Sequence, residues 1–202
     1  MSRQPFHHGN LRAELLERAE TVLRERGAET LSLRELARDA GVSHGAPRSH
    51  FIDRNALLNA LAERGFNRLA ETVEGAVNAL PAQSRSGPEL LRAAGTAHLD
   101  FALLNPALGA LMVAAKAEDP SGPVHDAAAR LFGLMARLVT TVLGPDHDPM
   151  KIARLTLLLS ATIQGILSLV VSKRISSAQG GILLDDAVRV FVAGSTTDGA
   201  PD

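Results

Sequence analysis

The sequence predicts an all-α protein with two domains and about nine helices. Two observations predict this class: apolar residues recur at spacings of three and four along most of the chain, and loops rich in Gly, Pro, Ser and Asp separate the periodic segments. No stretch alternates apolar and polar residues as a half-buried strand does. We expect an N-terminal domain over residues 1–54 and a C-terminal domain over residues 55–202.

Composition restricts the class of protein. A chain of 202 residues, of which 46% are hydrophobic, can bury a sizeable core. The chain has no uninterrupted apolar run of about 18 residues and no apolar signal region at its N-terminus, so we expect a cytoplasmic protein without a membrane segment. The absence of cysteine excludes disulfides, thiolate catalysis and Cys-based zinc sites.

The chain begins with an expected flexible arm over residues 1–9, followed by an amphipathic helix that starts near Asn10 and ends at Gly27. The apolar stripe of this helix must cover other elements, and the segment that follows is the obvious partner. In the arm, His7 and His8 are adjacent and lack the i, i+4 spacing of a helical metal site. We therefore expect no bound metal.

The segment Ser32–Phe51 contains two short helical patterns joined by a tight turn. Ser32 is placed to cap the first helix, Gly41 supplies the bend, and Ser43 is placed to cap the second helix. Such a pair of helices forms a helix-turn-helix, whose second helix can enter the DNA major groove. With the preceding helix it would complete a three-helix domain.

The same residues resemble the N-terminal domain of the TetR family of transcriptional regulators. The resemblance depends on an LA pair (Leu36, Ala37), AGVS (Ala40 to Ser43), Gly45, HF (His50, Phe51), a basic residue (Arg54) and an A-L pair (Ala56, Leu57). It covers residues 10–66 well and the remainder only in architecture. It implies a homodimeric, ligand-responsive DNA-binding protein, usually a repressor.

The sequence departs from the family pattern at three places. Arg48 stands where the family usually has a tyrosine that contacts phosphate, Pro47 replaces a small or aliphatic residue, and Arg54-Asn55 replaces Lys-Glu. Arg48 can hold a phosphate or read O6 and N7 of a guanine, and the sequence leaves both alternatives open.

We expect the DNA contacts to come from both helices of the motif and from the start of the next helix. Arg34 and Arg54 are expected to bind phosphates, Gly45 and Ala46 to permit close approach, and His50 either to pack or to contact phosphate. The expected contact residues are Ser32, Arg34, Ser43, His44, Gly45, Ala46, Pro47, Arg48, Ser49, His50 and Arg54.

The remaining elements are longer helices. The first starts at Asp53 or Asn55 and runs to about Leu80, a length of about 37 Å that suits a lever between two domains. After it we expect helices over residues 89–104, 106–117, 124–143, 150–173 and 184–192, with a loop at SSAQGG, residues 176–181. Residues 155–171 are apolar nearly all round, which predicts a homodimer through the helices at about 124–143 and 150–173. Such a dimer suits a pseudo-palindromic operator on double-stranded DNA.

The C-terminal domain is expected to bind a small apolar effector, because the resemblance implies a ligand. His98 and Gln164 are the expected polar anchors of the pocket. The candidate lining residues are His98, Phe101, Leu104, Leu108, Leu111, Met112, Phe132, Met135, Val139, Ile163 and Gln164. Plain core packing is the alternative interpretation of the apolar members.

Three classes of function compete. A ligand-responsive repressor without a cofactor accounts for both domains. A helical small-molecule carrier or interaction module would account for the C-terminal domain but not for the AGVSHG arrangement. An enzyme is not expected, because the sequence has no nucleophile elbow, phosphate loop, metal-ligand cluster or paired carboxylates in an apolar setting.

Overall fold

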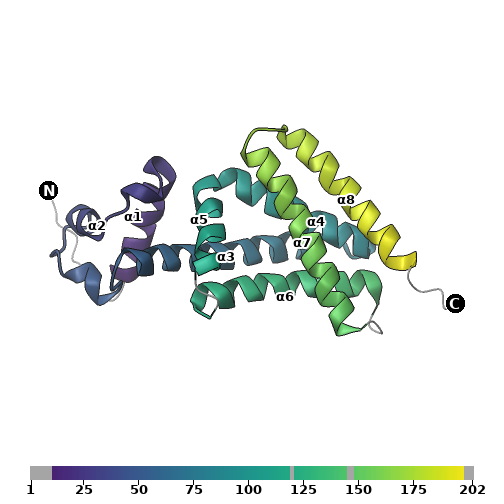
Figure 1. Ribbon diagram of the computed structural model, residues 1–202, viewed down its shortest axis with the longest axis horizontal. Coiled ribbons are helices and arrows are strands. Elements are labelled where there is room, and N and C mark those ends of the chain that lie inside the picture. The colour runs from purple at the N-terminus through teal and green to yellow at the C-terminus, as the bar shows by residue number, and fades with distance from the viewer. Residues whose placement is uncertain (1–10, 119–120, 145–147, 198–202) are drawn as a thin grey trace. The chain divides into compact units, whose positions relative to one another are not determined.

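The computed structural model describes residues 11–118, 121–144 and 148–197. Within these ranges every regular element is an α-helix or a 3-10 helix, which confirms the predicted all-α class (Figure 1). The described residues form eight α-helices, close to the nine expected for the whole chain. They are α1 (Leu11–Arg26), α2 (Leu33–Asp39), α3 (Arg54–Asn78), α4 (Gly87–Leu104), α5 (Pro106–Glu118), α6 (Pro123–Leu143), α7 (Pro149–Val171) and α8 (Ser177–Thr197). Three 3-10 helices are η1 (Ala28–Thr30), η2 (Ala46–Ser49) and η3 (Ala82–Ser84). The predicted N-terminal arm lies outside the described residues.

The chain forms two compact units. The first contains the described residues up to Gly65 together with Asn105–Asp126, and the second contains Phe66–Leu104 and the residues from Ala127 onward. Helix α3 therefore contributes its first half to one unit and its second half to the other. The domain boundary between residues 54 and 55 stays a prediction.

The first unit is built around buried leucines, as the amphipathic pattern of its helices requires. Leu15 and Leu23 of α1, Leu36 of α2 and Leu57 of α3 are almost fully buried. Helix α5 packs against α1. It also approaches α3 closely, because a Cβ on Gly65 would lie 2.7 Å from Met112 Sδ.

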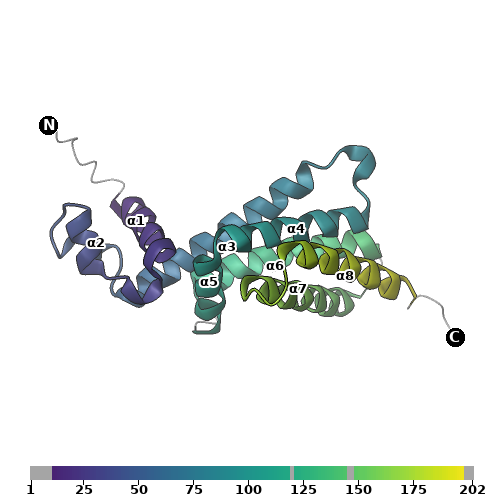
Figure 2. The same ribbon diagram turned by 90° about the horizontal axis from the view of Figure 1, so that it is seen from above.

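The second unit packs α4, α7 and α8 against one another, and Figures 1 and 2 show α7 and α8 side by side. Two glycines permit this close packing: a Cβ on Gly95 of α4 would lie 2.7 Å from Leu184 Cδ1, and one on Gly180 of α8 would lie 2.5 Å from Val170 Cγ2. Helix α7 buries one face through Leu159, Ile163 and Ile166. A side chain at either glycine would require Leu184 or Val170 to shift.

The predicted loop at residues 176–181 is wrong, because α8 begins at Ser177. Ser176 and Gln179 form a capping box: the Ser176 amide donates to Gln179 Oε1 at 2.9 Å, and the Gln179 amide donates to Ser176 Oγ at 3.2 Å. These bonds satisfy two amides at the start of α8. They stabilise a first turn that the two following glycines would otherwise weaken. The Ser-x-x-Gln spacing was the sequence signal for this helix.

Burial lowers the pKa of His98 on α4 from 6.5 to about 4. The unfolded chain therefore binds this proton at a higher pH than the folded chain, and stability falls as pH drops below about 6.5 toward 4. We expect the free energy of unfolding to be about 2 kcal/mol lower at pH 5 than at pH 7.5 through this group. Denaturant titrations at one fixed protein concentration measure it.

A His98→Leu substitution should remove this part of the pH dependence, since leucine binds no proton. His125→Gln is the matched control, because His125 is exposed on α6 and its removal should leave the dependence unchanged. Parallel pH curves for wild type and His98→Leu would contradict the assignment.

Candidate nucleic-acid interface

Backbone hydrogen bonds, without a side-chain cap, define both ends of helix α2. Ser32 occupies the N-cap position as expected, but its side chain makes no capping hydrogen bond. At the other end, Gly41 has a φ of 69° and the amides of Gly41 and Val42 donate to the carbonyls of Arg38 and Ala37. This pair of bonds is a Schellman motif, and it turns the chain sharply after a helix of 7 residues.

The second helix of the motif differs from the predicted α-helix. Only Ala46–Ser49 is helical, as the 3-10 helix η2, so Ser43 does not cap an α-helix. The reason is Pro47, which has no amide to donate to the Ser43 carbonyl; that carbonyl accepts from the Ala46 amide at 3.0 Å instead. Pro47 is buried and anchors η2, and the Phe51 amide closes the turn by donating to its carbonyl at 2.8 Å.

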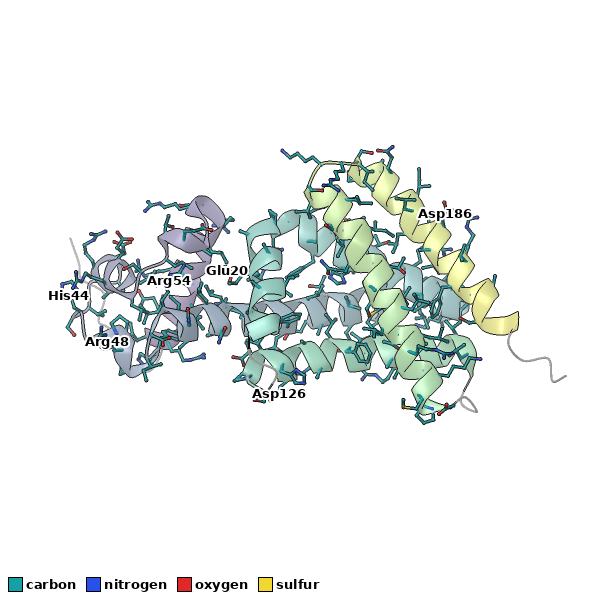
Figure 3. The ribbon with its side chains drawn as sticks, viewed as in Figure 1. Glu20, His44, Arg48, Arg54, Asp126 and Asp186 are labelled. Atoms are coloured by element: carbon teal, nitrogen blue, oxygen red, sulfur yellow. The ribbon has the colours of Figure 1, made fainter. Side chains whose placement is uncertain are left out.

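Most of the predicted contact residues lie exposed around this turn. Figure 3 shows His44 and Arg48 at an outer edge of the first unit. The exposed members of the predicted set are Arg34, Ser43, His44, Gly45, Arg48, Ser49, His50 and Arg54. Ala46 and Ser32 are half-buried, and Pro47 is buried and so supports the turn.

The guanidinium of Arg54 has partners inside the first unit. Its Nε donates to the Leu31 carbonyl at 3.1 Å and its Nη2 donates to the Ala28 carbonyl at 2.6 Å. The neighbouring Asp53 caps α3 by accepting from the Ala56 amide at 2.8 Å. The sequence had left the start of this helix open between Asp53 and Asn55, and the cap identifies Asp53 as the N-cap residue with which it begins.

Sequence reasoning missed Arg18 of α1. Its Nη1 donates to the Asp39 carbonyl at 2.8 Å, while Nη2 and Nε bind Glu14 Oε1 at 2.8 and 3.2 Å. The Glu14 to Arg18 spacing of four residues signalled the ion pair, but only the tertiary structure places α2 beside it.

The predicted effector residues are divided between the two units. Leu108, Leu111 and Met112 of α5 are buried in the first unit, while Phe101, Met135, Val139 and Ile163 are buried in the second. His98 and Phe132 are partly buried. Leu104 is 76% exposed and Gln164 is also exposed, so the role of Gln164 as a polar anchor stays a prediction that the burial of this residue does not support.

Two family models match the chain. The model described as bacterial regulatory proteins, tetR family, matches residues 15–61, which contain the helix-turn-helix. The model described as Tetracyclin repressor-like, C-terminal domain, matches residues 91–191, half of the chain.

Individual relatives agree with these models. The HTH-type transcriptional repressor AcnR of Corynebacterium efficiens is 42% identical over 64 residues, which is 32% of this chain and 34% of AcnR, so the match spans about a third of that relative. A protein of unknown function from Rhodococcus sp. RHA1 is 38% identical, with a TM-score of 0.80 over 95% of this chain and 98% of that chain. A TetR-family regulator from Streptomyces coelicolor shares the fold at 17% identity, with a TM-score of 0.67 over 93% and 97%. The chain therefore belongs to the TetR family of helix-turn-helix transcriptional regulators.

Proposed function

We propose that this protein is a cytoplasmic, dimeric repressor that binds a pseudo-palindromic operator and leaves it when a small, mainly apolar effector binds. The observation that carries the proposal is the exposed polar segment from Ser43 to His50, which follows the short α2 and is anchored by the buried Pro47 of η2. Its His, Ser and Arg side chains can donate to phosphates and base edges.

Selection of random duplexes by the purified protein tests operator binding. We expect an inverted repeat with half-sites about one helical turn apart, bound with an affinity that falls steeply with salt. Absence of any enriched sequence would overturn the operator proposal and favour a helical carrier instead.

The dimer interface is proposed on α7 and α8. Several large apolar side chains of these helices are exposed in the protomer, an arrangement that a lone soluble chain rarely maintains. They are Met150, Leu157, Leu158 and Val171 on α7, and Ile182, Leu183 and Val190 on α8. The sequence had paired α7 with α6, but Leu134 and Leu138 of α6 are buried within the protomer. We therefore propose α8 in place of α6.

Helix α7 is also long and apolar enough to cross a membrane, with 33% of its most apolar window buried. A second copy accounts better for its exposed face, because α7 lies against α4 and α8 on its other side and the family regulates transcription. Sedimentation of the protein in detergent-free buffer as a dimer would support this choice, and sedimentation as a detergent-requiring aggregate would contradict it.

We propose the chemistry of the effector from a buried, unpaired acceptor on α3. Among the described residues, Asn67 Oδ1 is buried and accepts no hydrogen bond. A buried acceptor without a partner costs about 1–3 kcal/mol, so an effector with a hydroxyl or N–H group would gain affinity by donating to it. Because Asn67 lies on α3, which also begins at Arg54 beside the helix-turn-helix, this contact would act on the helix shared by both units.

Matched apolar alcohols and methyl ethers are the probes for this effector site. We expect an alcohol to release operator DNA at a concentration about tenfold lower than its ether, because only the alcohol donates. An Asn67→Leu substitution should abolish the difference. Equal potency of alcohols and ethers on the wild-type protein would rule out the donor requirement.

Gly45 offers a prediction that separates DNA binding from folding. An added Cβ would meet no atom within 4 Å, and the φ of −84° is accessible to any residue, so nothing in the protomer requires glycine here. We expect Gly45→Val to leave the melting temperature within a few degrees and to lower operator affinity about tenfold, since the side chain would enter the space that the DNA occupies. Thermal melting and operator titration measure the two effects.

Gly133→Val is the matched control, because Gly133 on α6 also has open space around its missing Cβ. This variant should bind operator like the wild-type protein. Unchanged operator affinity in Gly45→Val would show that DNA does not approach this turn.

A further inference from the structure

Helix α2 is too short to be held by its own hydrogen bonds. It has 7 residues, and its N-cap side chain makes no hydrogen bond. Isolated helices below about 12 residues are marginal in water, so the orientation of α2 must come from its neighbours. Helix α2 in turn contacts η2, and a 3-10 helix of 4 residues is itself a weak element. The exposed segment from Ser43 to His50 is therefore positioned by its contact with α2 together with the buried Pro47.

At the C-terminal end of α2, a side chain of α1 donates a hydrogen bond to one of the last carbonyls. The Schellman motif uses the carbonyls of Ala37 and Arg38, and the Ala40 amide donates to Leu36. The Asp39 carbonyl accepts from Arg18 Nη1 at 2.8 Å. Glu14 holds the other edge of the Arg18 guanidinium, so this side chain is fixed from both sides. A cation at this end also interacts favourably with the helix dipole.

At the N-terminal end the support comes from α3. Arg54 spans two carbonyls, those of Ala28 and Leu31, in the short connection that leads into α2. Leu31 is buried, so this connection is anchored to the core as well as to Arg54. A cation in the first turn of α3 opposes the dipole of that helix, so its position is not explained by the stability of α3.

We propose that Arg18 and Arg54 are positioning residues that hold the two ends of α2 and thereby set the angle of the DNA-facing segment; this rests on the proposed operator binding. We call the two side chains with their carbonyl acceptors the α2 clasp. In this assignment Arg54 acts through α2 and is not the phosphate contact that its exposure and charge suggest.

Arg54→Lys tests the clasp because it keeps the charge and removes the fork. A lysine ammonium cannot span both carbonyls with the geometry of a guanidinium, whereas it still binds a phosphate. We expect operator affinity to fall about tenfold, affinity for a random duplex to change less than about twofold, and the salt slope to stay unchanged. Amide exchange at Leu36 of α2 and at its C-cap residue Ala40 should become faster, while exchange in α1 stays the same.

Three results would overturn the clasp. Retention of operator affinity in Arg54→Lys, with a salt slope lowered by about one in Arg54→Ala, would identify a phosphate contact. Equal losses on operator and random duplex would identify a general loss of folded protein. An unchanged rate of amide exchange in α2 of Arg54→Lys would show that Arg54 does not hold α2 in place.

Two further variants keep the test independent of folding defects. Arg12→Lys is the control, since Arg12 Cζ lies 5.4 Å from the centroid of the Phe51 ring in the same unit and Arg12 is not part of the α2 clasp. It should leave the ratio of operator to random affinity unchanged. If Arg54→Lys does not fold, Arg18→Lys is measured in its place, with the same expected loss of operator affinity and faster α2 exchange. Should the wild-type protein enrich no duplex, the exchange measurement still tests the clasp alone.

Discussion

Replacing Arg34, His44 and Arg48 together by alanine should lower operator affinity at least about a hundredfold. All three side chains are exposed in the helix-turn-helix, and each lost phosphate or base contact costs about 1–3 kcal/mol. Exposed substitutions of this kind change the free energy of unfolding by about 0.5 kcal/mol or less each. The melting temperature of the variant should therefore stay close to that of the wild-type protein. Operator titration at two salt concentrations measures the loss.

The single variant Arg48→Ala separates the two roles that the sequence left open for this residue. If Arg48 binds phosphate, affinity should fall for every sequence and the salt slope should drop by about one. If it reads a guanine, the slope should stay constant and specificity should relax at one base pair of each half-site.

A charge-matched control distinguishes contacts from overall charge. Arg130 and Arg137 of α6 are exposed and lie in the second unit. Their combined replacement by alanine removes the same two formal positive charges as the first variant, with His44 counted as neutral, and should change operator affinity only slightly. A loss as large as that of the first triple variant would show that these three helix-turn-helix side chains make no specific contact.

Leu157→Asp should convert the dimer into monomers. Leu157 is 63% exposed on α7, so the substitution leaves the protomer core intact. In a two-fold interface the change places two unpaired carboxylates against apolar surface, which we expect to raise the dimer dissociation constant more than about a hundredfold. Sedimentation equilibrium measures this constant, and operator affinity should fall with it because a monomer binds only one half-site.

Ala129→Asp on α6 is the control for the interface. Ala129 is exposed on the helix that the sequence had placed in the dimer. We expect this variant to remain dimeric. Dimerisation that is lost in Ala129→Asp and retained in Leu157→Asp would return the interface to α6.

Much of the architecture was predictable because it depends on local pattern. The spacing of Leu15, Ala19 and Leu23 predicted α1 and its buried face, and both are confirmed. The helix expected over residues 150–173 is α7, which begins one residue earlier at Pro149, where a missing amide costs little. The errors arose where one residue altered the expected backbone pattern: Pro47 prevents an α-helix in the second half of the motif, and the capping box at Ser176 starts α8 earlier than its glycines suggested.

The helical class, the family and the helix-turn-helix segment were predictable from the sequence, because periodicity, caps and the AGVSHG motif are local properties of the chain. The contacts of each charged or apolar side chain were not predictable, because they depend on how the helices pack. The tertiary structure placed Arg54 on the carbonyls of Ala28 and Leu31, and it left Leu157 exposed while burying Leu138. These outcomes depend on residues far apart in the sequence, and helical spacing gives the face of a residue but not the partner that covers it.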